Sequence, residues 1–332
     1  MFPRSRHREL YWVVVLGGLL LTATATADDV GGQGAVKLPQ AGPWDLVDDP
    51  VIREMMRLDA IAPFEDLAPV WDWRDEKLQA ELDAGLARLG LDDDARRRKL
   101  AVAFVDVTDP ERPRMAAVNG DRMMYAASLP KIAVLLGAFE KIAQGKMEYD
   151  DETRELMERM IQVSDNAATT KLMHRVGKKY IARVLLSPRY RLYDPEHNGG
   201  LWVGKDYAKA GVWKRDPMNN LAHAATALQV ARFYYLLYTE QLVTPKYSKE
   251  MQEVMSGRHL DHKFVRALRR LAPRMLLMRK SGSWRTFHSD SALVERGGRA
   301  YIAVALANHD EGGDWMGQLI VELDGIMNPE KS

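Results

Sequence analysis

The 332-residue chain contains no cysteine, so disulfide bonds, a lipid-modified cysteine and a thiolate metal site are excluded. It also lacks an excess of one charge, because 47 lysines and arginines face 46 aspartates and glutamates. A near-neutral chain offers no electrostatic footprint for nucleic acid, and we expect no such partner. With 46% hydrophobic residues, the chain is suited to a large folded domain that its core alone stabilises.

Long apolar runs are scarce too. The run near the N-terminus, residues 10–21, is shorter than the roughly 20 residues that a membrane span needs. Three arginines precede it and Ala25-Thr26-Ala27 follows it, which is the pattern of a secretory signal peptide. We expect residues 1–27 to be this signal peptide and the protein to be periplasmic or secreted; an uncleaved membrane anchor is the alternative. Residues 28–70, with early glycines and several prolines, predict a tether or N-terminal extension.

The remaining residues, 71–332, carry strand patterns near both ends and helix patterns between them. Apolar or alternating stretches predict strands at 99–107, 114–118, 275–283, 291–295 and 299–308. Amphipathic patterns predict helices at 74–89, 151–163, 221–239, 248–255, 263–271 and 315–327. We therefore predict an α+β fold, in which a five-stranded antiparallel sheet is flanked by the terminal helices and an all-helical lobe is inserted. The sheet lobe would comprise about 71–122 and 272–332, and the helical lobe about 123–271.

Ser128 and Lys131 stand where a polar segment gives way to the apolar run 132–139. Pro130 fits only the first turn of a helix, so we expect the helix to begin near Ser128. The i to i+3 spacing then puts the lysine amine on the same face as the serine hydroxyl. Burial that depresses the amine pKa would let the lysine accept the serine proton. Taken alone, the pair is more typical of a helix-capping serine beside an ordinary lysine.

Two further motifs favour the catalytic interpretation. Ser164-Asp165-Asn166 joins two predicted helices, and Lys280-Ser281-Gly282 lies on a predicted strand. At average composition the three motifs rarely occur together in this order by chance. From about Trp73 to its C-terminus, the chain resembles the class A β-lactamase and penicillin-binding serine hydrolase superfamily, for which this motif set is known.

The resemblance implies a role for each motif residue. Ser128 would be the nucleophile and Lys131 would help to deprotonate it. Ser164 would pass the proton to the leaving nitrogen, Asn166 would hold the substrate amide, and Lys280 would orient Ser164 and the substrate carboxylate. Ser281, Gly282 and Ser283 would bind substrate along the strand, with the backbone N–H groups of Ser128 and Ser283 as the oxyanion hole.

The long polar segment 187–220 is expected to be functional, because loops of that length in compact domains usually are. Its stretch 193–198 resembles the family loop that carries the deacylating glutamate, but Asp194 stands at the glutamate position. The base could be Asp194 or Glu196, and Asn198 could hold the water. Asp194 is one methylene shorter than glutamate, so we expect slow turnover and an acyl-enzyme that accumulates. If neither carboxylate acts, water activation would fall to Lys131.

These residues predict an exported serine hydrolase that β-lactams acylate at Ser128 and that hydrolyses them slowly. The alternatives are a cell-wall D,D-peptidase acting on peptidoglycan stem peptides and a non-catalytic wall-binding relative. The expected partners are a β-lactam or an acyl-D-Ala-D-Ala-like peptide, with peptidoglycan as a further candidate; the oligomeric state stays open. No cofactor is expected, and His259 and His262 lack the third clustered ligand that a zinc site would need.

Overall fold

The computed structural model describes residues 69–209, 211–257, 260–272 and 275–329, all of which fall in the compact unit Ala41–Ser332. The predicted signal peptide, nearly all of the predicted tether, and His259 lie outside the described residues. None of the described helices combines the length and the apolar character that crossing a membrane requires.

A five-stranded antiparallel sheet is built from both ends of the domain, which confirms the predicted architecture. Its strands lie in the order β2-β1-β10-β9-β8, so β8 is an edge strand. Their bounds are β1 Leu100–Asp106, β2 Arg114–Val118, β8 Leu276–Trp284, β9 Phe287–Arg296 and β10 Arg299–Asn308. Helices cover both faces of this sheet, so the side chains on both faces of its central strands are buried. Those strands are therefore continuous apolar stretches in the sequence.

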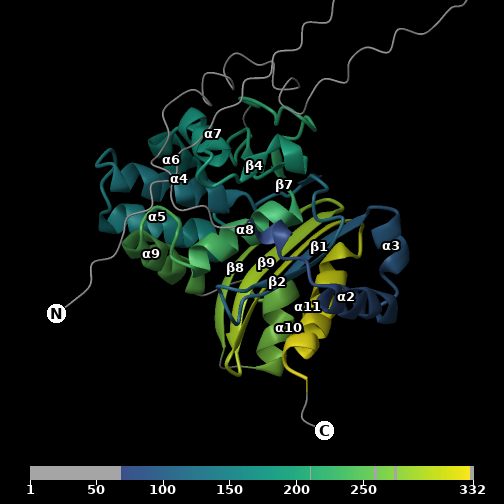
Figure 1. Ribbon diagram of the computed structural model, residues 1–332. Helices are drawn as coiled ribbons and strands as arrows, with labels where there is room; N and C mark the ends of the chain where they lie inside the picture. Colours follow the sequence, from purple (N-terminus) through teal and green to yellow (C-terminus); the bar gives the residue numbers. More distant parts are fainter. Residues whose placement is uncertain (1–68, 210, 258–259, 273–274, 330–332) are drawn as a thin grey trace, which may run out of the picture. The chain divides into compact units, whose positions relative to one another are not determined.

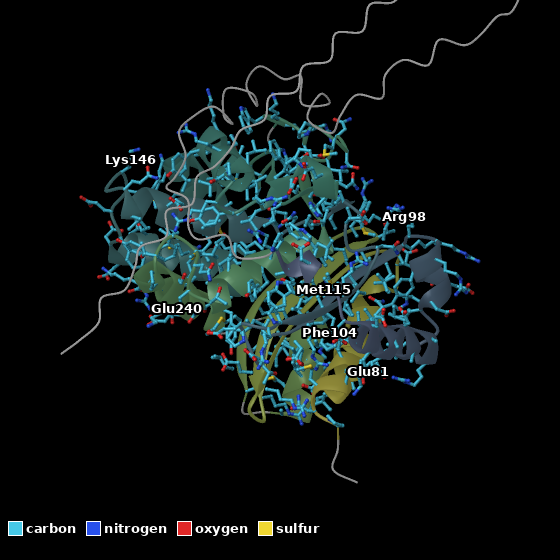
Figure 2. The ribbon with its side chains drawn as sticks, in the orientation of Figure 1. Glu81, Arg98, Phe104, Met115, Lys146 and Glu240 are labelled. Atoms are coloured by element: carbon cyan, nitrogen blue, oxygen red, sulfur yellow. The ribbon has the colours of Figure 1, made fainter. Side chains whose placement is uncertain are left out.

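Helices cover the two faces of this sheet. On one face lie α2 (Glu76–Arg88), α10 (Lys263–Leu271) and α11 (Gly312–Met327), and on the other lies α8 (Ala227–Tyr238) (Figure 1). Phe104 of β1 belongs to the core under α11, whereas Met115 of β2 belongs to the core shared with α8 (Figure 2). The assignment of 263–271 to the helical lobe differs from the structure, because the apolar side of α10 is buried against α11 and the sheet.

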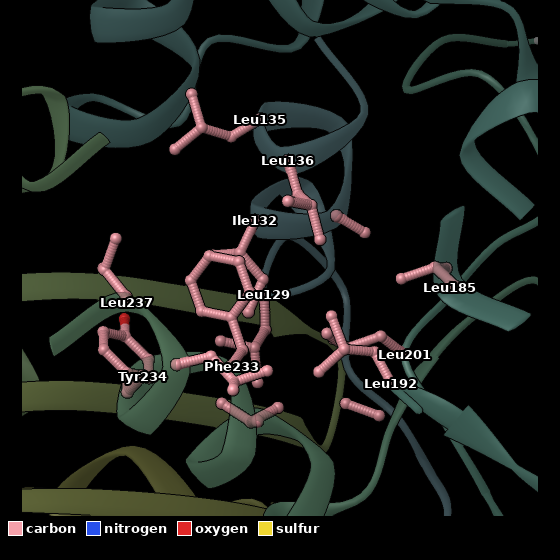
Figure 3. Close-up of a cluster of buried hydrophobic side chains, with 14 of the residues drawn as sticks. Leu129, Ile132, Leu135, Leu136, Leu185, Leu192, Leu201, Phe233, Tyr234 and Leu237 are labelled. Atoms are coloured by element: carbon pink, nitrogen blue, oxygen red, sulfur yellow. The ribbon is translucent and has the colours of Figure 1, made fainter. Parts of the chain in front are cut away.

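The second lobe packs around α4 (Lys131–Ala143), which is buried on nearly every side. Figure 3 shows Ile132, Leu135 and Leu136 of this helix in one apolar cluster with Phe233 and Leu237 of α8. The other elements of the lobe are α5 Asp151–Gln162, α6 Asn166–Val176, α7 Lys178–Leu186 and α9 Pro245–Ser256. The short helix α3 (Asp92–Arg96) and the 3-10 turns η1 (Val70–Asp72) and η2 (Pro195–His197) complete the helical elements that the structure describes.

The lobe is not purely helical, which corrects the prediction. A three-stranded sheet runs in the order β3-β7-β6, and β4 pairs with β5. These strands are β3 Met124–Tyr125, β4 Tyr193–Asp194, β5 Gly199–Gly200, β6 Trp202–Val203 and β7 His223–Ala225. The helix predicted from residue 221 consequently starts at Ala227, after β7, where the Thr226 side chain caps it by accepting from the Gln229 N–H.

Candidate active site

Ser128 lies in the turn that joins β3 to α4, and the helix begins three residues later than predicted, at Lys131. Tight turn bonds precede the helix, with Leu129 N–H donating to Ala126 O at 3.0 Å. Ala127 has a φ of 50°, in the left-handed region that costs energy for a residue with a side chain. Within the described residues, no protein group accepts a hydrogen bond from the Ser128 N–H or pairs with its hydroxyl, so both can serve a substrate.

Strand β8 passes very close to this turn at Gly282. A Cβ added there would lie 2.6 Å from Ser128 N and 2.9 Å from Leu129 N, and closer still to Ala126 O. Only glycine permits this approach. The backbone of Gly282 and Ser283 is therefore adjacent to the Ser128 N–H, the other group expected in the oxyanion hole.

The Lys131 amine is buried among acceptors from the Ser164 to Asn166 segment. Its Nζ donates to Ser164 O at 2.6 Å and to Asn166 Oδ1 at 2.8 Å, and it lies 3.3 Å from Ser164 Oγ. Burial lowers the pKa of Lys131 to about 7, against a smaller opposite effect of the Asp165 carboxylate. A substantial fraction of this amine is neutral near pH 7, as a general base requires.

Ser164 connects Lys131 to the second lysine of the site. Lys280 Nζ donates to Ser164 Oγ at 3.0 Å and to Ser281 O at 2.7 Å. Burial, assisted by the charge of Lys131, lowers the pKa of Lys280 well below its ordinary value. Ser164 itself has a φ of 60°, in the left-handed region, and its hydroxyl lies between the two amines. The structure thus brings three residues of the predicted site, Lys131, Ser164 and Lys280, into one hydrogen-bonded chain.

The remaining motif residues have separate positions. Asp165 caps α6 by accepting from Ala167 N–H and Ala168 N–H, and it pairs with Arg159. Ser281 Oγ lies 3.5 Å from His262 Nε2. The Ser283 hydroxyl accepts from Lys263 Nζ at 2.8 Å.

The candidate deacylating loop is held mainly by contacts with its own neighbours. Asp194 is buried, and its Oδ2 accepts from Arg191 at 2.7 Å and lies 3.3 Å from His197 Nδ1. Glu196 is exposed and lies 3.6 Å from Arg191. Asn198 donates to Asp121 O at 3.0 Å. In the described chain none of the three is hydrogen-bonded to the serine and lysine groups of the site.

Three residues that lie beside the site, Tyr207, His223 and Lys263, were not predicted from the sequence. The ring of Tyr207 lies 4.7 Å from Lys131 Nζ, and its hydroxyl donates to Ala127 O at 3.1 Å. The ring of His223 stacks on Tyr207 at 4.2 Å, and burial lowers the pKa of His223 to about 3, so it is neutral. Lys263, the third neighbour, contacts β8. Only Tyr207 lay in a segment that the sequence marked as functional, the stretch 187–220.

Comparisons with known proteins identify the family and the fold of the chain. The sequence profile described as the beta-lactamase enzyme family matches residues 81–154 and 152–323. A β-lactamase from Sphaerobacter thermophilus has a similar structure, with a TM-score of 0.59 at 15% identity, covering 75% of this chain and 97% of that one.

Two further solved structures show the same fold. The L158E mutant of PBP-A, an acyl-enzyme complex with penicillin G, has a TM-score of 0.58 at 16% identity and covers 79% of this chain and 99% of its own. A β-lactamase from Chitinophaga pinensis has a TM-score of 0.57 at 14% identity, covering 73% and 99%. No curated protein matches the sequence.

Proposed function

The chain belongs to the beta-lactamase enzyme family, and from that premise we propose that it is an exported serine hydrolase which β-lactams acylate at Ser128 and which releases the product slowly. The observation that carries the proposal is the hydrogen-bonded chain from Lys131 through the Ser164 hydroxyl to Lys280. It supports the assignment of Lys131 as a base beside Ser164 as a proton carrier, the combination that acyl transfer to a nitrogen leaving group needs.

Acylation uses these groups in sequence. The neutral Lys131 amine takes the proton of Ser128 as the hydroxyl attacks the lactam carbonyl. The N–H groups of Ser128 and Ser283 stabilise the oxyanion, since a preorganised donor pair costs no reorganisation in the transition state. Ser164 then gives its proton to the lactam nitrogen and regains one from the lysines on either side, with Lys280 holding its hydroxyl in place.

Three features support slow deacylation. The carboxylate of Asp194 already accepts from Arg191 and from the Glu196 N–H, so its oxygens serve the loop. Tyr207, the aromatic neighbour of Lys131, has a pKa well above its ordinary value because of burial, and a neutral phenol is a poor base. The PBP-A mutant, of similar fold, was captured as an acyl-enzyme complex with penicillin G.

Intact-mass measurement after incubation with a panel of β-lactams tests the proposal. We expect the wild type to gain the mass of the antibiotic and to lose it slowly, and Ser128→Ala to gain nothing. Asp194→Asn and Glu196→Gln then show which carboxylate, if either, activates water: the variant that prolongs the adduct identifies it. A wild type that stays unmodified over a long incubation refutes the β-lactam assignment.

The second candidate is a D,D-peptidase that cleaves peptidoglycan stem peptides. It is favoured by the absence, within the described residues, of a carboxylate hydrogen-bonded to Ser128 or Lys131, which leaves Lys131 to act in both half-reactions. Release of D-alanine from a muropeptide, without turnover of a chromogenic cephalosporin, would select this candidate. Export is tested separately by the N-terminal sequence of the secreted protein, which we expect to start at Asp28.

A further inference from the structure

Lys263 lies on the carbonyl side of the peptide unit that joins Gly282 to Ser283. Its Nζ donates to Gly282 O at 2.7 Å and to Ser289 O at 3.0 Å, two residues that face each other across β8 and β9. It also donates to the Ser283 hydroxyl at 2.8 Å. The lysine is held there by its place at the first position of α10, with a φ of 50°. Three hydrogen bonds therefore fix the ammonium group against β8 and β9.

The peptide that Lys263 contacts carries the Ser283 N–H, one of the two groups expected in the oxyanion hole. A trans peptide is planar, so its C=O and N–H point in opposite directions. Gly282 O accepts from the ammonium, and the Ser283 N–H therefore points away from Lys263. Gly282 adjoins the Ser128 N–H so closely that a Cβ would lie 2.6 Å from that nitrogen.

We propose that Lys263 is a positioning residue which polarises the Gly282–Ser283 peptide and so strengthens the Ser283 N–H as an oxyanion donor. Hydrogen bonds in series strengthen one another, because a peptide whose oxygen accepts from a cation has a more positive N–H. The fixed charge also stabilises the negative oxygen that forms on the far side of the peptide. This inference rests on the proposed function, and it explains why a lysine stands at the first position of α10.

The charge of Lys263 is set by its surroundings. Burial lowers its pKa to about 8; the carboxylate of Asp290 opposes this and the guanidinium of Arg279 adds to it. The groups that also interact with Lys263 or line its surroundings are His262 before α10, Lys280 on β8, His288 on β9 and Asp314 on α11. Lys263 is therefore mainly charged at pH 7 and loses its charge as the pH rises through about 8.

The experiment compares acylation by penicillin G in the full-length wild type, Lys263→Met, Lys263→Arg and the control Arg266→Met, which removes a cation from the exposed side of the same helix. We expect Lys263→Met to acylate about tenfold more slowly, with unchanged noncovalent affinity. The loss is smaller than the roughly 10²- to 10³-fold that follows removal of a whole oxyanion donor, because the donor stays in place. Lys263→Arg should keep most of the rate, and Arg266→Met all of it.

Two readouts separate this role from a structural one. The ester carbonyl of the acyl-enzyme, followed by infrared spectroscopy with carbonyl-labelled penicillin, should absorb at higher frequency in Lys263→Met, since a weaker donor polarises it less. Above about pH 8 the wild-type acylation rate should fall, whereas Lys263→Arg should hold its plateau because guanidinium stays charged.

The outcomes are distinct. A folded Lys263→Met variant with wild-type rate and carbonyl frequency overturns the inference and leaves the proposed function intact. A wild type that penicillin never acylates refutes the proposed function itself, and the inference falls with it. If Lys263→Met does not fold, Lys263→Gln replaces it: this variant keeps a donor without the charge, and a wild-type carbonyl frequency and alkaline limb in it overturn the inference.

Discussion

The replacement Asp165→Asn should shift the pH dependence of acylation toward acid. The pKa of Lys131 is about 7 because burial lowers it and the Asp165 charge raises it in part. Asparagine caps a helix about as well as aspartate, so α6 should keep its start while the charge disappears. Arg159 then loses its carboxylate partner, and its cation pushes the pKa of Lys131 in the same direction. The amine becomes neutral at lower pH.

Coulomb's law gives the size of the effect. For charges about 8 Å apart the interaction is ~0.5 kcal/mol in water and ~2 kcal/mol at an effective dielectric constant of about 20. Because the side chain of Asp165 is 21% exposed, solvent screens it in part, and we take the lower half of that interval. At 1.36 kcal/mol per pKa unit, this is a decrease of roughly 0.5 to 1 unit. The neutral fraction of Lys131 at pH 6 then rises about three- to fivefold, while at pH 9 it is nearly complete in both proteins.

The assay is the second-order rate constant for labelling by a fluorescent penicillin, measured from pH 5.5 to 9. The variant should label about three- to fivefold faster than the wild type at pH 6 and at about the same rate near pH 8, where Lys131 is mostly neutral in both proteins. Asp151→Asn is the matched control, because it removes an exposed carboxylate from the first turn of α5. An acid limb that stays in place in Asp165→Asn, or that moves to higher pH, refutes Lys131 as the base.

Three further predictions concern the framework of the site. Gly282→Ala should abolish labelling, because the methyl group would overlap the turn that carries the nucleophile; retention of even a tenth of the rate would contradict this. Arg279→Met leaves Asp290 buried without its ion-pair partner, so urea denaturation should show a loss of about 3–5 kcal/mol, and a loss below about 1 kcal/mol would argue against it. Asp194→Asn removes the carboxylate partner of Arg191, so the free energy of unfolding should fall by about 1–3 kcal/mol in thermal and chemical denaturation. A near-neutral change, as expected for an exposed loop carboxylate, would contradict this.

Elements with a strong apolar pattern could be predicted from the sequence to the residue. The bounds of β2, α10 and β10 agree with the expected stretches, since α10 has a helical repeat of apolar residues and each of the two strands is an apolar stretch bounded by turn residues. Two-residue strands such as β3 and β4 carry no period at all and could not be found. The apolar run at β7 was interpreted as the start of α8, because a short run without alternation fits a helix equally well.

Some residues of the site could likewise be predicted from the sequence, and others could not. The three motifs marked where Ser128, Lys131, Ser164 and Lys280 stand, and the structure joins the last three by hydrogen bonds. Their catalytic roles stay predictions. Tyr207 could not have been assigned to Lys131 from sequence, because 76 positions separate them and only the fold of the loop brings the ring beneath the amine. The same holds for Lys263, whose contact with β8 depends on where α10 docks.

The order of the strands also governs when the sheet can assemble as the chain is synthesised. The middle of the sheet is β10, which comes last in sequence among the five strands, and it pairs with β1 on one side and β9 on the other. Until residue 299 has been made, the β1–β2 hairpin has nothing to join it to β8. A nascent chain that already contains Ser128, Ser164 and Lys280 therefore has no assembled sheet lobe. The two halves of the sheet are therefore joined only after β10 has formed between β1 and β9.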